Sequence, residues 1–265
     1  MAIKLGILGW PLEKTFSPKI QTYLGNHTGV KLEYEKIQYE NITLENVNKI
    51  NRNFQGYNVT IPHKSSVFNL LSKLENVDFD ETAVNTKVVN TVKSSKDRIF
   101  VANTDLVGIE QTFKYMDYSL VNKKVLILGN GSSSKTLTSF LNNRGIVYIA
   151  SRNDEENTIS YEEVKNIAHE INLIINTTPL GMPPYEKEKL PIDIKLFKNL
   201  ELFFNLGYGL SKNWVNGITL NKVEYVDGLI MLIGQAIESF NIWTDKNIKF
   251  DEVYEKILNE VINEN

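Results

Sequence analysis

The chain has 265 residues, of which 42% are hydrophobic and 23% charged, and its formal net charge is −3. These values predict a soluble globular protein of one or two domains and give no sign of a nucleic-acid-binding surface. Cysteine is absent and the three histidines lack metal-ligand spacing, which excludes disulfides, thiolate catalysis and the usual cysteine- or histidine-based metal sites.

The sequence predicts no segment for secretion or for membrane insertion. Its first residues enter a predicted strand directly, and its longest wholly apolar run, Leu229 to Ile233, is too short to span a bilayer. We therefore expect no signal peptide, no membrane segment and a cytoplasmic location.

A buried strand is predicted over residues 3–8, followed by a helix that begins near Ser17. Ser17 is a good helix N-cap, with Pro18 at the first helical position, so capping is the alternative to a binding role for its hydroxyl. Thr15 presents a second hydroxyl just beyond the strand end, where ligands collect in open α/β sheets. A second strand over 32–37 and a helix over 44–50 follow.

A third strand begins at Gly56 and stops at Pro62, which cannot donate to a sheet ladder. Asn58 and Thr60 are one strand period apart, so they are expected to point to the same face. Lys64 follows where a helix begins. An amide, a hydroxyl and an ammonium at one strand end suit a small polyhydroxylated ligand, although an ordinary turn with a solvated lysine is the alternative.

A hairpin is predicted from residues 88–92 and 99–102, joined across 94–97. Asn90 lies in its first arm, where a buried amide without partners costs roughly 1–3 kcal/mol. Asp105 follows the second arm and precedes a helix. It is therefore either a functional carboxylate or a helix N-cap.

Residues 122–227 predict a small doubly wound sheet of alternating strands and helices. A strand over 124–128 is followed by a Gly-x-Gly turn at Gly129 and Gly131, then by a helix ending at a Gly145 cap and a strand over 147–150. This context predicts nucleotide binding, although the third small residue of the fingerprint is replaced by Ser134. Further strands are expected over 173–176, 202–206 and 223–226.

The residues after the second strand of this unit predict the choice of nucleotide. A carboxylate there would bind the ribose 2′-hydroxyl of NAD, but Ser151 and Arg152 stand there instead and suit a 2′-phosphate. Beyond the sheet, a strongly apolar helix over 229–243 carries one conspicuous polar residue, Gln235. A final amphipathic helix is expected to bury Val253, Tyr254, Ile257, Leu258 and Val261.

Taken in order, these motifs resemble the shikimate 5-dehydrogenase family, whose members reduce 3-dehydroshikimate in the biosynthesis of chorismate and the aromatic amino acids. The resemblance covers nearly the whole chain. The motifs are Thr15-x-Ser17-Pro18, Asn58-Val59-Thr60-Ile61-Pro62-His63-Lys64, Val89-Asn90-Thr91, Asn103-Thr104-Asp105, Gly129-x-Gly131, Asn176-x-Thr178-Pro179-x-Gly181 and Asp227-Gly228-Leu229-x-Met231-Leu232-x-x-Gln235-Ala236.

The resemblance implies an α/β fold of two α/β domains with a cleft between them. Residues 1–106 with 228–265 would form the substrate-binding domain, and residues 107–227 a Rossmann-type domain that binds NADP. Lys64 and Asp105 would be the catalytic pair. The substrate would be held by Thr15, Ser17, Asn58, Thr60, Asn90 and Gln235. The cofactor would be held by Gly129, Asn130, Gly131, Ser132, Ser133, Ser151, Arg152, Thr178, Gly228 and Met231. No metal is implied, and the chain would be a monomer or a homodimer without nucleic-acid or membrane partners.

Elementary chemistry agrees with these roles. Reduction of a ketone needs a hydride on carbon, which the cofactor supplies, and a proton on oxygen. A lysine is protonated at pH 7 and can donate that proton, with Asp105 beside it to orient it. The amides of Asn58, Asn90 and Gln235 both donate and accept, which suits ring hydroxyls.

The sequence also departs from the family pattern. Thr15 stands in place of a serine, Lys87 in place of a glycine, and Phe204 where the family supplies a tyrosine, although Tyr208 is close in sequence. Acidic residues 154–156 follow Arg152 where a second basic residue is usual. Two alternatives therefore stay open: a related dehydrogenase that prefers quinate or NAD, and a binding or regulatory homologue without efficient chemistry.

Overall fold

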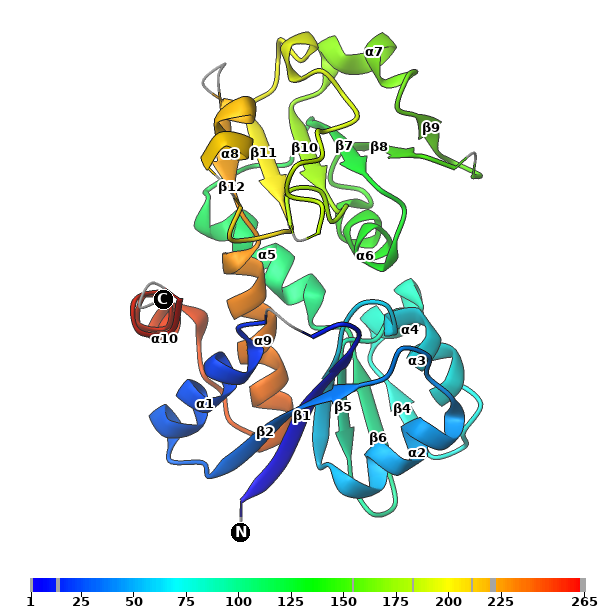
Figure 1. Ribbon diagram of the computed structural model, residues 1–265, viewed down its shortest axis with the longest axis vertical. Coiled ribbons are helices and arrows are strands. Elements are labelled where there is room, and N and C mark those ends of the chain that lie inside the picture. Colours follow the sequence, from blue (N-terminus) through cyan, green and yellow to red (C-terminus); the bar gives the residue numbers. More distant parts are fainter. Residues whose placement is uncertain are drawn as a thin grey trace. The chain divides into compact units, whose positions relative to one another are not determined.

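The computed structural model describes residues 2–12, 15–153, 155–182, 184–210, 212–219 and 223–262 (Figure 1). The chain divides into two compact units: unit 1 comprises Met1–Thr112 and Met231–Asn265, and unit 2 comprises Phe113–Ile230. The divisions fall inside α5 (Asp105–Tyr115) and near the start of α9 (Leu229–Thr244). Each unit contains its own six-stranded sheet.

The sheet of unit 1 is mixed, with strand order β2-β1-β3-β5-β6-β4. Its strands are β1 (Ile3–Gly9), β2 (Leu32–Gln38), β3 (Gly56–Val59), β4 (Val77–Phe79), β5 (Thr91–Ser94) and β6 (Ile99–Ala102). β1 pairs in parallel with β2 and β3, whereas β5 runs antiparallel to both β3 and β6. The start of β5 therefore lies at the same edge of the sheet as the ends of β3 and β6.

Helices cover both faces of this sheet (Figure 1). On one side lie α2 (Leu44–Asn53), α3 (Lys64–Leu71) and α4 (Glu81–Thr86), whose apolar residues share a core with Tyr57 and Val59 of β3. On the other side lie α1 (Ser17–Thr28) and α9, and α10 (Phe250–Ile257) with a final turn η3 (Leu258–Ile262) completes the unit. Because side chains alternate along a strand, Asn58 faces α9 instead of that core.

The sheet of unit 2 is entirely parallel, with order β12-β11-β10-β7-β8-β9. Its strands are β7 (Lys124–Leu128), β8 (Ile146–Ser151), β9 (Ile159–Ser160), β10 (Leu173–Asn176), β11 (Leu202–Asn205) and β12 (Glu224–Val226). From β7 the chain runs first to β8 and β9 and then returns to β10 on the other side. The point between β7 and β10 is the switch point at which such sheets bind ligands. The α/β fold class with a Rossmann-type sheet is confirmed.

The strict alternation of strands and helices expected for unit 2 is only partly met. Helices α6 (Ser132–Leu141), α7 (Val164–Ile167) and α8 (Lys212–Thr219) follow β7, β9 and β11. A short η1 turn (Ala168–Glu170) extends α7, and η2 (Ile194–Leu196) is the only helical turn in the described residues between β10 and β11. The apolar residues of this connection, including Ile194 and Phe197, still pack into the core, so the sheet is covered without a regular helix.

Some expectations about element boundaries are wrong, and two elements were not predicted. Gly145 does not cap α6, which ends at Leu141; Asn143 takes the left-handed conformation at φ 64° instead. Gly145 is needed for a different reason, because a Cβ there would lie 2.7 Å from the carbonyl oxygen of Lys123. The first hairpin arm begins at Thr91, so Asn90 precedes it. Finally, β4 and α4 occupy a segment for which the sequence analysis predicted no element.

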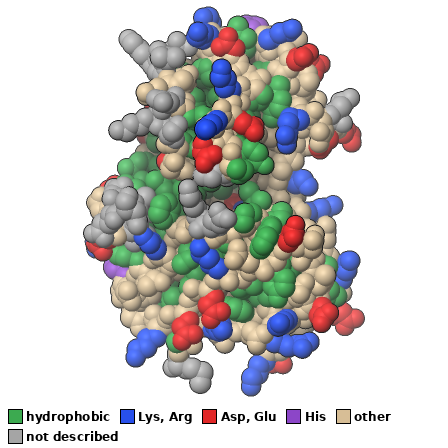
Figure 2. Space-filling model, in the orientation of Figure 1, with side chains coloured by type: hydrophobic (Ala, Val, Ile, Leu, Met, Phe, Trp, Pro, Cys, Tyr) green, Lys and Arg blue, Asp and Glu red, His purple; other side chains and the backbone are tan. Residues whose placement is uncertain are grey.

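The surface mixes charges of both signs. On the face shown in Figure 2, lysine, arginine and acidic side chains are interspersed with apolar ones. Within the described residues, no helix is both long enough and apolar enough to cross a bilayer. The burial expected for the last helix is confirmed at Val253, Tyr254 and Ile257, whereas Leu258 is half-buried and the side chain of Val261 lies outside the described set.

Lys87 yields a prediction about stability. It ends α4 in the left-handed conformation, with φ 54° and ψ 37°, and its side chain is exposed. That conformation costs an L-residue roughly 1–2 kcal/mol, whereas glycine loses only about 0.5–1 kcal/mol more chain entropy on folding. We expect Lys87→Gly to raise the free energy of unfolding by about 0.5 kcal/mol in urea denaturation, by difference of these terms.

Gly29 provides the reciprocal control. It ends α1 at φ 71°, and no described atom lies within 4 Å of the position a Cβ would take. Gly29→Ala should therefore lower the free energy of unfolding by about 1 kcal/mol through backbone conformation alone. If Gly29→Ala destabilises as expected but Lys87→Gly also destabilises, the Lys87 side chain contributes stability that outweighs its backbone.

Candidate functional site

Three elements bring candidate side chains to one edge of the unit 1 sheet. Lys64 begins α3 after β3, Asn90 immediately precedes β5, and Asp105 begins α5 after β6. These positions meet because β5 is antiparallel to the two strands beside it. Residues separated by up to 41 positions in the chain thus contact one another directly.

The Lys64 ammonium donates a hydrogen bond to Oδ2 of Asp105, and the two side chains are only 12% and 5% exposed. The other carboxylate oxygen, Oδ1, accepts from Nδ2 of Asn90 at 2.9 Å. Asp105 is the first residue of α5 and its carboxylate is committed to these two partners, so the N-cap interpretation is not supported. Removing either member of this pair would leave the other charge buried without a partner, which strongly destabilises a folded protein.

The Asn90 side chain is the centre of this site and is 2% exposed. Its Oδ1 accepts from the backbone N–H of Thr104 at 2.8 Å and from the Thr91 hydroxyl at 3.0 Å. Its Nδ2 donates to Asp105 and, at 3.3 Å, to Oε1 of Gln235 on α9. A backbone N–H can only donate and a carboxylate only accept, so the orientation of this amide is fixed.

Asn58 is held from two sides and is 5% exposed. Its Nδ2 donates to the backbone carbonyl of Asn90 at 3.1 Å and to Oγ of Ser239 at 2.9 Å, and its Oδ1 accepts from the Tyr34 hydroxyl at 2.7 Å. Thr60 lies just beyond β3, which ends at Val59. Thr60 is tied to β1, through its N–H to the Leu8 carbonyl at 2.8 Å.

Ser17 does not cap α1, and its own N–H is bonded by Thr15. Ser17 is the first residue of α1 rather than its cap, and the residue before it, Phe16, has no capping side-chain hydrogen bond. Thr15 Oγ1 accepts from the Ser17 N–H at 3.2 Å and donates to the Ser17 hydroxyl at the same distance. The structure therefore brings the two hydroxyls together at the end of β1 but reverses their local roles.

Four polar residues of this network were not singled out from the sequence: Tyr34, Thr91, Thr104 and Ser239. Thr91 and Thr104 adjoin Asn90 and Asp105 in the motifs, which was an available signal. Ser239 lies one helical turn after Gln235 on α9, so helical periodicity predicts that the two share a face. Tyr34 lies on β2 in a partly exposed alternating pattern, and nothing local marks it.

A second candidate site lies in unit 2 at the turn between β7 and α6. Gly129 adopts φ 99°, and a Cβ there would lie 2.7 Å from Oγ1 of Thr177. Gly131 has no described atom within 4 Å of the corresponding position, so its outer side is open. α6 then begins at Ser132 with no capping side-chain hydrogen bond from Gly131. A helix N-terminus with an open glycine turn is suited to bind a phosphate.

The flanking candidates are distributed around this turn. Ser132 and Ser133 form the first turn of α6 and are half-buried. Asn130 Nδ2 donates to Oε2 of Glu155 at 2.6 Å. Ser151 ends β8 and is buried, whereas Arg152 is exposed.

Arg152 has a defined neighbourhood on the unit 2 surface. Burial raises the pKa of the Tyr161 phenol, and the positive charge of Arg152 nearby partly opposes that shift. The two residues therefore lie close enough to interact electrostatically. Asp154, the alternative ribose ligand, lies outside the described residues.

The remaining cofactor candidates have packing roles of their own. The Thr178 methyl lies beside Gly129, and its hydroxyl donates to Oδ1 of Asn176 at 2.6 Å. A Cβ on Gly228 would lie 2.0 Å from the Leu206 carbonyl oxygen, so close packing alone requires glycine there. Met231 belongs to unit 1, where its backbone packs against Gly108 of α5.

The position that departs from the family tyrosine is explained by packing. Phe204 lies on β11 with no exposed surface, and its ring meets that of Phe113 edge to face at 6.0 Å between centroids. It therefore belongs to the core of unit 2. Tyr208 is half-buried, and its role stays a hypothesis.

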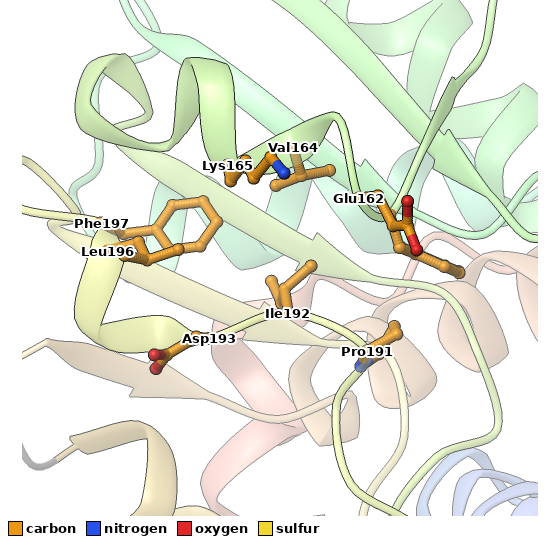
Figure 3. Close-up of a pocket in the computed structure, with 9 residues that line it drawn as sticks. Glu162, Val164, Lys165, Pro191, Ile192, Asp193, Leu196 and Phe197 are labelled. Atoms are coloured by element: carbon orange, nitrogen blue, oxygen red, sulfur yellow. The ribbon is translucent and has the colours of Figure 1, made fainter.

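Unit 2 also contains a cavity of about 370 Å³, lined in part by Lys165, Ile192, Asp193 and Phe197 (Figure 3). It contains none of the candidate catalytic, substrate or cofactor residues. Its walls mix apolar, acidic and basic side chains without converging hydrogen-bonding groups, so we place the candidate sites at the sheet edges instead. The described residues contain no group of three or more acidic or histidine side chains able to hold a metal ion.

Comparison with known proteins agrees with this geometry. The family model for the shikimate dehydrogenase substrate binding domain matches residues 7–92. A protein of Caldanaerobacter subterraneus named shikimate dehydrogenase (NADP(+)) is 30% identical over 279 residues, covering 97% of this chain and 96% of that protein. Shikimate dehydrogenase 1 of Peptoclostridium difficile superposes with a TM-score of 0.84 at 26% identity, covering 98% of this chain and 100% of the other.

A chorismate mutase/shikimate 5-dehydrogenase fusion protein of Clostridium acetobutylicum superposes with a TM-score of 0.86 at 27% identity, over 98% of this chain and 99% of the other. Fold and matches together define a two-domain α/β protein with a Rossmann-type sheet. The chain belongs to the shikimate dehydrogenase family.

We expect opposite effects when each of the two glycines of the β7–α6 turn is replaced by alanine. A Cβ on Gly131 meets no described atom, so Gly131→Ala should leave the melting temperature nearly unchanged while filling the space in which a phosphate would approach the backbone. We expect at least tenfold weaker nucleotide binding, a loss of about 1.4 kcal/mol, in isothermal titration calorimetry.

Gly129→Ala is the matched variant in the same turn. Gly129 has φ 99°, and a Cβ there would lie 2.7 Å from Thr177, so alanine must strain the backbone. We therefore expect Gly129→Ala to lower the melting temperature, unlike Gly131→Ala. If Gly131→Ala binds nucleotide as tightly as the wild type, the turn is not part of the cofactor site.

Proposed function

We propose that this protein catalyses the NADP-dependent, reversible reduction of 3-dehydroshikimate to shikimate. One observation carries the proposal: a lysine and an aspartate, buried together, meet at the edge of a sheet in a chain whose curated relatives are named shikimate dehydrogenase (NADP(+)). An ammonium in that setting is positioned to supply a proton to a carbonyl oxygen.

The proposal divides the work between the two units. Residues 1–106 with 228–265 hold the substrate, and residues 107–227 hold the cofactor. The match of the substrate-binding family model to residues 7–92 supports the first assignment, and the parallel sheet with its glycine turn supports the second. A cytoplasmic location and a monomeric or homodimeric state belong to the same proposal.

The acid–base step follows from the Lys64–Asp105 pair. Lys64 donates the proton that the substrate oxygen gains on reduction, and takes one back when shikimate is oxidised. Asp105 holds the ammonium in place from one carboxylate oxygen, while Asn90 holds the carboxylate from the other. Because both side chains are nearly buried, water competes weakly for these bonds and the geometry is set before substrate arrives.

The surrounding polar groups suit the substrate. The hydroxyls of Thr15 and Ser17 lie together and are assigned to its carboxylate. Asn58, Thr60, Asn90 and Gln235 are assigned to the ring hydroxyls, although most hydrogen-bonding capacity of Asn58 is already used within the protein. We expect Asn58 to act mainly by holding its neighbours.

The cofactor supplies the hydride. On the protein side, Gly129, Asn130, Gly131, Ser132 and Ser133 form a turn whose open glycine leaves room for a pyrophosphate. Ser151 and Arg152 follow β8, where a Rossmann-type unit contacts the adenosine ribose. Thr178 borders the turn, and Gly228 and Met231 complete the proposed set. The residues present therefore fit a dinucleotide with a 2′-phosphate.

The experiment is a spectrophotometric assay of shikimate oxidation with NADP, run beside quinate and NAD, on the wild type and Lys64→Arg. The arginine keeps the positive charge beside Asp105 but does not give up its proton in proteins. We expect Lys64→Arg to lower kcat by about 10²–10⁴, the usual worth of general acid–base catalysis, with NADP affinity unchanged.

Near wild-type turnover in Lys64→Arg would show that another group supplies the proton. Faster turnover of quinate than of shikimate by the wild type would show that the protein is the related dehydrogenase that prefers quinate. Nucleotide binding without turnover of either substrate would favour the regulatory homologue.

Arg152 tests cofactor choice. Its guanidinium can form two charge-assisted hydrogen bonds to a 2′-phosphate, and NAD forfeits them. We expect tenfold or greater preference for NADP if these bonds are worth about 1.4 kcal/mol. Arg152→Ala should remove most of that preference and leave turnover with NAD nearly unchanged.

Arg144 offers a matched control for charge, because its guanidinium also lies in unit 2 but stacks on Phe140 at 4.2 Å. Arg144→Ala should leave the ratio of NADP to NAD activity unchanged. A wild-type protein that already prefers NAD would contradict the assignment of Arg152 and direct attention to Asp154.

A further inference from the structure

The proposed catalytic pair is the end of a longer line of buried hydrogen bonds that begins on β2, at Tyr34. The Tyr34 hydroxyl donates to Oδ1 of Asn58 at 2.7 Å, and Asn58 Nδ2 donates to the backbone carbonyl of Asn90 at 3.1 Å. The Asn90 side chain then donates to Asp105, which accepts from Lys64. The line joins five residues from separate segments, with the Asn58–Asn90 link made through the Asn90 backbone carbonyl; Tyr34 is half-buried, whereas Asn58, Asn90 and Asp105 are buried.

The direction of each bond in this line is determined by chemistry. A backbone carbonyl cannot donate, so the group of Asn58 that faces Asn90 must be its NH₂. The Asn58 oxygen therefore faces Tyr34, and the phenol must be the donor. The Tyr34 hydroxyl is enclosed enough for burial to raise its pKa well above the ordinary value, so the phenol keeps the proton that it donates.

A second anchor reaches the same residues from α9. Ser239 has no exposed surface, and its Oγ accepts from Asn58 at 2.9 Å and bonds Thr91 at 2.7 Å and Thr104 at 3.2 Å. Thr91 and Thr104 in turn hold Oδ1 of Asn90. Tyr34 and Ser239 thus act on the same two amides from opposite sides.

We infer that Tyr34 and Ser239 are positioning residues for the proposed reaction. Neither touches Lys64 or Asp105. They fix the amide of Asn58 and the backbone and side chain of Asn90, and Asn90 fixes the carboxylate that aims the ammonium. The effect of the two residues on turnover rests on the proposed function. Their effect on the position of Asn90 rests on the hydrogen bonds alone.

Tyr57 provides a matched control for Tyr34. It is a fully buried tyrosine of unit 1, and its hydroxyl also donates to an asparagine oxygen, Oδ1 of Asn51 at 2.9 Å. The Asn51 oxygen also accepts from the Ser94 hydroxyl, and these two side-chain hydrogen bonds involve no residue of the line that ends at Lys64. Tyr57→Phe therefore removes the same chemical group, also hydrogen-bonded to an asparagine oxygen, without removing a hydrogen bond of the line that ends at Lys64.

The test compares Tyr34→Phe, Tyr57→Phe, Ser239→Ala and the double variant Tyr34→Phe/Ser239→Ala. We expect the two phenylalanine variants to lose similar amounts of thermal stability. Of these two, only Tyr34→Phe should lower the single-turnover rate of NADPH oxidation, by roughly tenfold, with the KM for NADPH unchanged, and Ser239→Ala should lower the same rate. Because Tyr34 and Ser239 hold the same amides, their fold-losses should not multiply in the double variant.

Equal turnover in Tyr34→Phe and Tyr57→Phe, with an active wild type, would overturn the inference and leave the proposed function standing. An inactive wild type would instead overturn the proposed function. The inference is then tested by NMR of ¹⁵N-labelled protein, in which the side-chain amide signals of Asn90 should move in Tyr34→Phe and stay in place in Tyr57→Phe. Unmoved Asn90 signals in Tyr34→Phe would reject it.

Discussion

The side-chain amide of Asn90 is the contact on which the arrangement of unit 1 around its proposed site depends. It joins two strand ends and one helix: Asn90 immediately precedes β5, the segment after β6 supplies Thr104 and Asp105, and α9 supplies Gln235. An amide this deeply buried has to satisfy all its donors and acceptors, since an unpaired one costs roughly 1–3 kcal/mol. That requirement makes the strand ends converge in one geometry and leaves Asp105 little freedom.

The three glycines assigned to the cofactor, Gly129, Gly131 and Gly228, illustrate how function and packing can share a residue. Gly129 and Gly228 are required by close contacts within unit 2, to Thr177 and to the Leu206 carbonyl. Gly131 alone has open space where a side chain would go. A glycine in such a motif is therefore required by close packing at some positions and leaves room for a ligand at others, and only the structure distinguishes the two.

Much of the fold and part of the candidate site followed from the sequence. The strand–turn–helix at 124–141 and the polar residues after β3 and β6 were predictable because hydrophobic period and turn chemistry are local signals. The contacts of Tyr34 and Ser239 were not, because they depend on which strand lies beside which and on how α9 packs. The predicted Gly145 cap was wrong because the chain turns at Asn143 in the left-handed conformation, while Gly145 is needed for its close approach to the Lys123 carbonyl, a contact that no local signal marks.

The line of hydrogen bonds from Tyr34 has a consequence for how the family diversifies. The phenol of Tyr34 and the carboxamide of Asn58 cannot be exchanged independently, because loss of the phenol removes the donor to the Asn58 oxygen and loss of the carboxamide removes the acceptor of the phenol. Relatives that lack a tyrosine at the position of Tyr34 must supply the Asn58 oxygen with another donor, or lose the asparagine as well. Substitutions at positions 34 and 58 are therefore expected to covary across the family, even though the two residues are far apart in the sequence.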